Sequence, residues 1–388
     1  MFKFNFDIED VDETTLIFNT AEQTIPSSSE VSQSPFKEIS KQHLLDSLPS
    51  QLSCSPLSVT LQDSTQLHLA RRDLFDARFQ LISEGTEVPE NGNGSLDPHS
   101  ALSFLEAPSD LVPGVYEGGL KTWECSLDLV DYLHSLKQKE DFSVTGKRVL
   151  EIGCGTAVPS IYLLNQVFSS PKQHKDTVFH LQDYNDSALE LVTMPNVVLA
   201  WYMSPASEAF RNKTSASQLD NDGPVVFPPP DASSPAEIPI TPELKAAFEE
   251  SLHEYRISLR FFSGSWSTFD FKSTGGGYNV VLTSETIYRL DSLPSLLNLL
   301  FNACEPTVTS SGLQAGAPID EAVSKLALSP SYLCLVAAKV FYFGVGGGTT
   351  EFVQAVENRE KGGGKATVRT VWERNIGVKR KIMQLSWS

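Results

Sequence analysis

The sequence is short of long apolar runs and of cysteine. None of its apolar stretches approaches the roughly 18–20 residues that a membrane-spanning helix needs. The first residues, MFKFNFDIEDVDETT, carry acidic charge where a secretory or organellar signal would need basic charge. The five cysteines form no C-x-x-C pair and have no histidine at zinc-ligand spacing. We therefore expect a soluble intracellular protein with free thiols and without a bound metal.

Basic residues are also scarce. The chain has 30 lysines and arginines against 48 acidic residues, and residues 1–110 alone hold 18 acidic side chains against 6 basic ones. A net charge of -18 repels the phosphates of nucleic acids and favours encounters with basic proteins. An alternative is that the acidic residues near the N-terminus only confer solubility. We expect a basic protein partner, and no direct binding of nucleic acid or membrane.

The distribution of apolar residues divides the chain into three parts. Residues 1–35 are polar and unpatterned, so we expect a disordered acidic tail. Residues 36–107 form an N-terminal extension and a linker, and residues 108–388 form the main domain. Two polar segments of this domain, 204–242 and 306–320, are long for loops inside a compact domain. We expect both to be mobile insertions.

Short β-branched runs alternate with helical stretches from residue 147 onward. This pattern is typical of a parallel sheet that is covered by helices on both faces. The last two expected strands, 366–374 and 378–387, are joined by a turn at 375–377, which indicates an antiparallel hairpin. A nicotinamide-binding sheet usually stays parallel, whereas the methyltransferase sheet contains an antiparallel last strand. We therefore expect an α/β fold with a seven-stranded, Rossmann-like methyltransferase sheet and a C-terminal antiparallel hairpin.

The segment VLEIGCGTA (149–157) carries the strongest local signal. Its strand ends in an acid, Glu151, and Gly153 and Gly155 then allow the backbone to approach a ligand before a helix begins. Ala157 stands where a dinucleotide-binding turn has its third glycine, and Glu151 argues against a pyrophosphate ligand. The sulfonium and amino groups of S-adenosylmethionine tolerate this negative charge. The alternative is an ordinary turn between a strand and a helix.

A second acid, Asp183, ends the second strand of the expected sheet. A carboxylate at this place can accept hydrogen bonds from both ribose hydroxyls of an adenosyl ligand. An isolated aspartate would more often cap the following helix, but the position of Asp183 directly after the second strand favours the ligand.

Six segments follow one another along the chain: DLVPGVYEGGLKTWE (110–124), EIGCGTA (151–157), QDYN (182–185), GSW (264–266), SETIY (284–288) and AKVFYFGVGGG (338–348). In this order they resemble the histidine protein methyltransferase family, whose members modify a histidine of ribosomal protein L3 of the large subunit. The resemblance runs from about residue 67 to the C-terminus and leaves out the two insertions. It implies S-adenosylmethionine as the cofactor, and a cytoplasmic and nuclear location.

The resemblance also assigns residues to the cofactor. The methionine part would lie against Glu151, Gly153 and Gly155, the ribose against Asp183, and the adenine beside Trp266, with Trp123 as a wall on the N-terminal side and Ser284 at the end of the fourth strand. Relatives often have an acid where Ser265 stands, so an adenine contact of Ser265 is not implied. Each tryptophan could equally belong to the core.

The acceptor side is expected at the same edge of the sheet. Glu285 and Tyr288 follow the fourth strand, where open α/β sheets bind ligands, and a carboxylate there can hold or deprotonate an acceptor group. Glu285 could also be a surface-loop acid. The glycine-rich loop after the fifth strand would let a substrate backbone approach closely, through Phe343, Gly344, Gly346 and Gly347. A P-loop is excluded because no Lys-Ser/Thr follows the glycines.

These features predict a protein-histidine N-methyltransferase that acts as a monomer on a basic, L3-like ribosomal protein. Two alternatives remain open at this point. One is a protein-lysine methyltransferase of the same fold, whose site would have to deprotonate an ammonium group. The other is a non-catalytic escort that holds a basic ribosomal protein through its acidic N-terminal region, and such an escort would need no intact glycine turn.

Overall fold

A computed structural model describes residues 34–83, 111–112, 116–140, 142–216, 226–304, 332–342, 346–361 and 364–387. The chain divides into residues 1–32 and 33–388, and all described residues belong to the second unit. Positions 1–33 of the predicted acidic tail and the whole predicted insertion 306–320 lie outside the described residues.

A mixed sheet forms the centre of this unit, in the order β1-β9-β7-β6-β10-β11-β14-β13-β12. Five neighbouring strands are parallel: β9 (Ile257–Ser263), β7 (Thr177–Asp183), β6 (Arg148–Ile152), β10 (Val280–Ser284) and β11 (Leu333–Lys339). The last strand, β14 (Arg380–Trp387), lies antiparallel between β11 and β13 (Gly364–Arg374). Two short strands, β1 (Lys37–Ile39) and β12 (Glu360–Lys361), extend the edges. The predicted α/β class is therefore confirmed.

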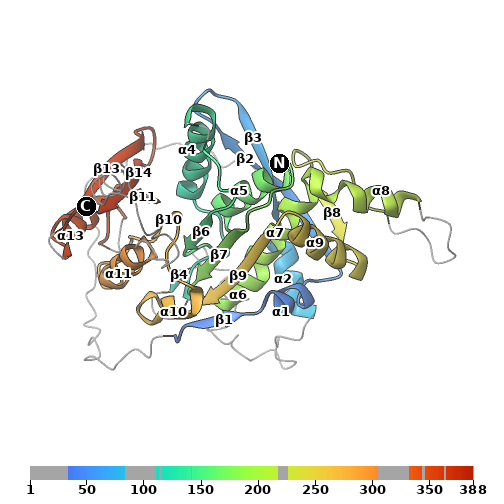
Figure 1. Cartoon of the computed structure of the whole chain (residues 1–388), viewed down its shortest axis with the longest axis horizontal. Coiled ribbons are helices and arrows are strands. Elements are labelled where there is room, and N and C mark those ends of the chain that lie inside the picture. The colour runs from blue at the N-terminus through green and yellow to red at the C-terminus, as the bar shows by residue number, and fades with distance from the viewer. Residues whose placement is uncertain are drawn as a thin grey trace, which may run out of the picture. The chain divides into compact units, whose positions relative to one another are not determined.

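Successive residues of the central strands point to opposite faces of the sheet, and each face is buried. Val149 and Val280 belong to one hydrophobic cluster, whereas Leu150 and Val281 belong to another. The first cluster includes side chains of α4 (Glu124–Glu140), α5 (Val158–Phe168), α7 (Met194–Tyr202) and α9 (Pro242–Glu254). The second includes α11 (Leu293–Ala303) and α13 (Thr349–Glu357). Helices thus cover both faces, as the continuous apolar character of the strands predicted (Figure 1).

The N-terminal extension packs onto the main domain. A small antiparallel sheet consists of β3 (Gln66–Arg72), β2 (Gln51–Thr60) and β8 (Ala236–Pro239). In the sequence, helix α1 (Lys41–Asp46) precedes β2 and helix α2 (Leu74–Ser83) follows β3. The buried Arg72 guanidinium donates to the Leu191 carbonyl at 2.8 Å, and the Arg72 backbone N–H donates to Asn196 Oδ1 at 2.8 Å. Because Leu191 and Asn196 flank the start of α7, the extension is tied to the helix layer of the main sheet.

The segment 204–242, which we expected to be a mobile insertion, forms regular elements in its described residues. These include the 3₁₀ turn Pro205–Ser207, helix α8 (Glu208–Ala216) and strand β8. Phe210 packs against Trp201 with ring centroids 6.0 Å apart, and Ile238 is fully buried where β8 pairs with β2. A few apolar side chains scattered among prolines and serines are therefore sufficient to fix this segment. In the described parts of the chain, no helix is long and apolar enough to cross a membrane.

Candidate functional site

The predicted cofactor residues meet at the carboxyl edge of the neighbouring strands β7, β6 and β10. Glu151 lies on β6, and Gly153 and Gly155 belong to the turn that follows this strand. Asp183 is the last residue of β7, and Ser284 is the last residue of β10. Because these strands are parallel neighbours, their ends share one edge, which is where open α/β sheets bind ligands.

The turn from β6 to α5 has a left-handed backbone that requires glycine. The φ angles of Gly153 and Gly155 are 60° and 48°. A Cβ atom on Gly153 would lie 2.7 Å from Cγ2 of Thr286, and one on Gly155 would lie 2.8 Å from the Gly119 carbonyl oxygen. The two glycines therefore allow close packing of this turn against two other loops. One is the 284–288 turn, and the other is the segment that leads into α4.

Gln182 holds the glycine turn in place, a role that the sequence did not suggest. The carbonyl oxygen of Gln182 accepts the Cys154 N–H at 2.8 Å. Its side-chain Oε1 accepts the N–H of Gly153 at 3.3 Å and the indole N–H of Trp266 at 3.1 Å. Its Nε2 donates to the Gly264 carbonyl at 2.9 Å. The signal in the sequence that could have indicated this role was the amide side chain of Gln182 near the end of an apolar central strand.

The two acids differ in their surroundings. Glu151 is fully enclosed and accepts the Ser160 N–H at 2.9 Å, and its burial raises its pKa to about 8. Asp183 accepts the Gly155 N–H at Oδ2 (2.8 Å) and the Asn185 N–H at Oδ1 (3.0 Å). Asn185, not Asp183, occupies the N-cap position of the following helix α6 (Asp186–Ala188). Asp183 therefore bridges the turns after β6 and β7 and does not cap the helix.

The two predicted tryptophans have different surroundings. Trp266 is half-buried, and its Cζ2 would lie 3.9 Å from a Cβ on Gly153. Trp123 precedes α4 and is 37% exposed, so it is not a core residue. The Lys339 ammonium lies 4.8 Å from the centroid of the Trp123 ring.

Ser265 makes contacts within the protein. Its backbone N–H donates to the Ser34 carbonyl at 2.9 Å, and a Cβ on Gly264 would lie 2.3 Å from the Pro35 carbonyl oxygen. The first described residues therefore cover the turn after β9. This covering leaves Trp266 as the predicted adenine neighbour on this side.

The residues at this edge fit an adenosyl ligand. A left-handed turn places backbone at the end of β6, and the Asp183 carboxylate at the end of the adjacent strand β7 offers acceptors for hydroxyl groups. Glu151, Gly153 and Gly155 would hold one end of such a ligand, Asp183 its ribose, and Trp266 its base. Among the described residues, no group of three or more histidine, cysteine, aspartate or glutamate side chains is placed to bind a metal ion.

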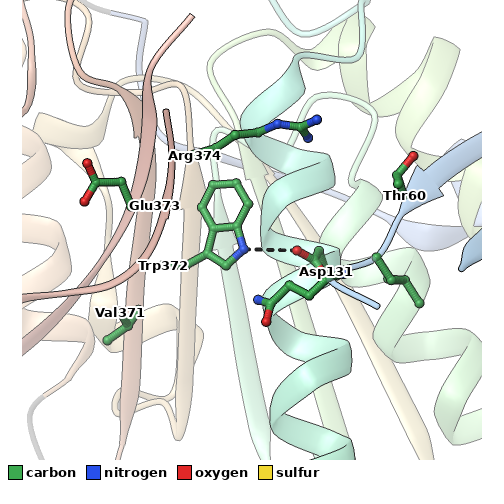
Figure 2. Close-up of a pocket in the computed structure, with 8 residues that line it drawn as sticks. Thr60, Asp131, Val371, Trp372, Glu373 and Arg374 are labelled. Atoms are coloured by element: carbon green, nitrogen blue, oxygen red, sulfur yellow. Dashed lines mark hydrogen bonds between the residues drawn. The ribbon is translucent and has the colours of Figure 1, made fainter. Parts of the chain in front are cut away.

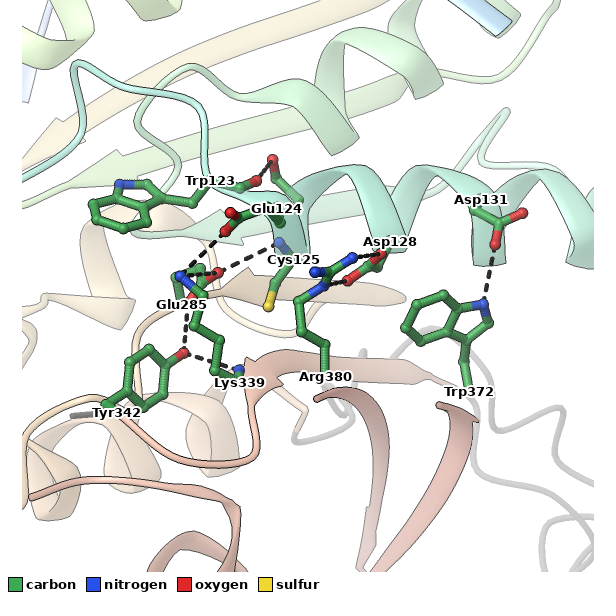
Figure 3. A network of polar contacts seen from close by, with 11 residues as sticks. Trp123, Glu124, Cys125, Asp128, Asp131, Glu285, Lys339, Tyr342, Trp372 and Arg380 are labelled. Atoms are coloured by element: carbon green, nitrogen blue, oxygen red, sulfur yellow. Dashed lines mark hydrogen bonds and ion pairs between the residues drawn. The ribbon is translucent and has the colours of Figure 1, made fainter. Parts of the chain in front are cut away.

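On the acceptor side, the Glu285 carboxylate is the centre of a polar network (Figure 3). Its Oε2 accepts the hydroxyl of Tyr342 at 2.7 Å, and its Oε1 accepts the Cys125 N–H at 3.4 Å. Oε1 also lies 3.6 Å from Nζ of Lys339. The Glu285 side chain is only 8% exposed, which rules out the alternative of a surface-loop acid.

Lys339 and Tyr342 were not predicted as functional residues. Lys339 Nζ lies 3.1 Å from Oε2 of Glu124. Burial lowers the pKa of Lys339, but the carboxylates of Glu285 and Glu124 outweigh burial and hold it above its ordinary value. Burial raises the pKa of Tyr342 well above its ordinary value, and the Glu285 charge raises it further. A lysine at the end of the apolar strand LCLVAAK was a signal that could have identified this network.

Tyr288 and the glycine-rich loop lie next to this network. The rings of Tyr288 and Tyr342 are in T-shaped contact, with centroids 6.4 Å apart. Gly347 donates its N–H to the Tyr288 carbonyl at 3.1 Å, and a Cβ on Gly347 would lie 2.3 Å from that oxygen. Gly346 is exposed, and a Cβ there would meet nothing within 4 Å. Phe343 and Gly344 lie outside the described residues, so their predicted role has no structural counterpart.

A hollow of about 430 Å³ lies farther along α4, away from the predicted residues (Figure 2). It is lined by Thr60, Leu61, Gln62, Asp131, Val371, Trp372, Glu373 and Arg374. Asp131 accepts the Gln62 N–H at 2.9 Å and the indole N–H of Trp372 at 3.0 Å. These contacts join α4 to the turn between β2 and β3 and to the end of β13. No predicted site residue lines this hollow.

Comparison with known proteins identifies close counterparts in sequence. The chain is 32% identical over 322 residues to Histidine protein methyltransferase 1 of Saccharomyces cerevisiae. This alignment covers 81% of this chain and 75% of the relative. It is 30% identical over 315 residues to the Schizosaccharomyces pombe protein of the same name, which covers 80% of this chain and 74% of the relative. No protein-family model matches the chain. Among solved structures, magnesium protoporphyrin IX methyltransferase from Synechocystis aligns with a TM-score of 0.32 at 8% identity, over 67% of this chain and 82% of that one.

Proposed function

Because the chain belongs to the histidine protein methyltransferase family, we propose that it methylates a histidine side chain of a basic, L3-like ribosomal protein. Methyl transfer as the reaction and S-adenosylmethionine as the methyl donor follow from the family, in agreement with the prediction from the sequence.

One observation carries the proposal for this site: the turn of the cofactor side packs directly on the turn of the acceptor side. Thr286 lies within the 284–288 segment and is the residue that a Cβ on Gly153 would strike, at 2.7 Å. Glu285 and Tyr288 belong to the same short segment. An acceptor ring held by either residue would therefore lie next to a ligand held by the glycine turn.

The chemistry demands positioning more than base strength. When bound, S-adenosylmethionine supplies a methyl group on a positively charged sulfur. An ordinary histidine has a pKa of about 6.5, so its ring is mostly neutral at cytosolic pH and carries one nucleophilic nitrogen. In the proposed mechanism, Glu285 or Tyr288 accepts the N–H of the other ring nitrogen. This hydrogen bond selects the tautomer of the ring and directs the lone pair of the nucleophilic nitrogen toward the methyl group of S-adenosylmethionine. Glu285 or water takes the proton that the ring loses.

The net negative charge of the chain supports a basic acceptor protein, since its sequence contains 48 acidic residues and only 30 lysines and arginines. An imidazole inside an assembled particle would be hard to reach, so we propose that the acceptor protein is modified before assembly. The test is methyl transfer to free L3 protein, to its histidine-to-alanine variant and to intact ribosomes. We expect methylation of the free wild-type protein only. Preference for intact ribosomes, or methyl on a lysine, would contradict the proposal.

Two variants connect this activity to the site. Glu285→Ala is expected to lower turnover by roughly 100-fold, with a much smaller effect on cofactor affinity, because Glu285 acts on the acceptor side. Gly153→Arg is the matched control on the cofactor side, and it should abolish cofactor binding as well as turnover. Equal loss of cofactor affinity in both variants would contradict this division of the site.

A further inference from the structure

Tyr342 connects the predicted acceptor loop to the predicted catalytic carboxylate. Its hydroxyl donates to Glu285 Oε2 at 2.7 Å and accepts the Lys339 backbone N–H at 3.3 Å. Its backbone N–H donates to the Gly347 carbonyl at 3.2 Å, which closes the base of the glycine-rich loop. One residue therefore contacts both the Glu285 carboxylate, through its hydroxyl, and Gly347, through its backbone N–H.

The Glu285 backbone is also held in an unusual conformation. Glu285 has a φ of 59°, a left-handed conformation that side chains other than glycine rarely adopt. Its N–H donates to the Ala337 carbonyl at 2.9 Å, which anchors the residue to the end of β11. Such a conformation persists only where the surroundings determine it, and here the surroundings are α4, β11 and Tyr342.

The number of donors limits what Glu285 can still accept. An ionised carboxylate has about four acceptor sites. The Tyr342 hydroxyl and the Cys125 N–H occupy two of them, and the Lys339 ammonium, 3.6 Å from Oε1, forms an ion pair with the same carboxylate. Lys339 also balances the charge of Glu124, at 3.1 Å. Few acceptor sites therefore remain for a donor from outside the protein.

We propose that Tyr342 and Lys339 are positioning residues that leave Glu285 a single direction for the N–H of the acceptor imidazole. They thereby determine which ring nitrogen receives the methyl group. This inference rests on the proposed histidine methylation. It adds that the choice of nitrogen comes from two residues that need not touch the acceptor.

The first test is Tyr342→Phe, which removes one oxygen atom. Free L3 protein is methylated, and the two methylhistidine isomers are separated and quantified by mass spectrometry against standards. The wild type should give one isomer. The variant should give a mixture, with kcat lowered by roughly 10- to 100-fold and cofactor affinity unchanged, because Glu285 can then turn. Tyr332→Phe is the matched control, since the Tyr332 hydroxyl accepts the Trp387 N–H at the opposite end of β11.

The second test uses the charge of Lys339. The titratable groups that face Glu285 are Cys125, Glu124 and Asp128 on α4, Lys339 at the end of β11, Tyr342, and Arg380 on β14, which is paired with Asp128. Lys339→Met keeps a long side chain but removes the cation that lies 3.6 Å from Oε1 of Glu285. Without this ion pair the Glu285 carboxylate is less firmly held, so the variant should also give a mixture of the two isomers, and Lys339→Arg should restore the single isomer.

The outcomes separate the two proposals. If the wild type gives one isomer, and both Tyr342→Phe and Lys339→Met keep that isomer, the positioning role is wrong and histidine methylation stands. If the wild type methylates no histidine, the proposed function itself fails. Calorimetry of cofactor binding by each variant shows whether it has kept its fold.

Discussion

The backbone N–H of Gly155 donates a 2.8 Å hydrogen bond to Oδ2 of Asp183, and this bond joins the turns after the two central strands β6 and β7. A Cβ on Gly119 would in turn lie 3.3 Å from Oδ1 of Asp183. One carboxylate thus holds three segments together at the predicted ribose site.

Asp183→Ala should therefore abolish cofactor binding and also destabilise the protein. The change leaves the N–H groups of Gly155 and Asn185 without their acceptor, which costs roughly 1–3 kcal/mol for a buried group. Calorimetry with S-adenosylmethionine and urea unfolding measure the two effects. Asp186→Ala is the matched control, because Asp186 is exposed and lies three residues away. Unchanged affinity in Asp183→Ala would refute the ribose assignment.

Glu151 should make stability depend on pH. Its pKa is raised to about 8 in the folded protein, so between its ordinary value of 4.5 and about 8 the folded state holds a proton that the unfolded state has lost. The stabilisation is fully present below pH 4.5 and is lost as pH rises toward 8, at roughly 1.4 kcal/mol per pH unit at most. Urea unfolding of the wild type and of Glu151→Gln at pH 5.5, 6.5 and 7.5 tests this. Because the Gln amide does not titrate, the wild type should lose stability relative to Glu151→Gln as pH rises; a constant difference would show that Glu151 is ionised throughout.

Asp131 should be important for stability and not for catalysis. Asp131→Ala removes the acceptor for the Gln62 N–H and the Trp372 indole N–H, so we expect a loss of roughly 1–3 kcal/mol. Asp131→Asn keeps one carbonyl acceptor and should be intermediate. Denaturant unfolding measures the loss, and methyl transfer at a temperature well below the midpoint should stay near the wild-type rate. A strong loss of activity in a stable variant would instead assign the hollow beside Asp131 a part in the reaction.

Strand β8, within the 204–242 segment, should contribute to the stability of the protein. Ile238→Ala removes a fully buried side chain from the pairing of β8 with β2, and we expect a loss of roughly 2–5 kcal/mol. Ile376→Ala is the matched control, because Ile376 is 81% exposed and its truncation should change stability by less than roughly 0.5 kcal/mol. Equal unfolding midpoints for the two variants would mean that β8 does not contribute to the fold.

The sequence alone determined the framework of the site. Glu151 and Asp183 could be placed at adjacent strand ends because buried parallel strands appear as continuous apolar runs, and the ends of such strands share an edge. Gly153 and Gly155 could be assigned to a close backbone approach because only glycine readily adopts the left-handed conformation found there. These inferences need only the order of residues along one strand and the turn that follows it.

Tertiary structure decided how the acceptor side is held. The hydrogen bonds of Glu285 to Tyr342 and Cys125 join residues that are 57 and 160 positions apart, and no local pattern specifies such partners. The segment 204–242 has a composition typical of a loop, yet Phe210 and Ile238 are buried because helix α7 and strand β2 offer surfaces that fit them. Burial and long-range partners depend on how distant segments pack, and for this reason the sequence could identify Glu285 but not the two residues that orient it.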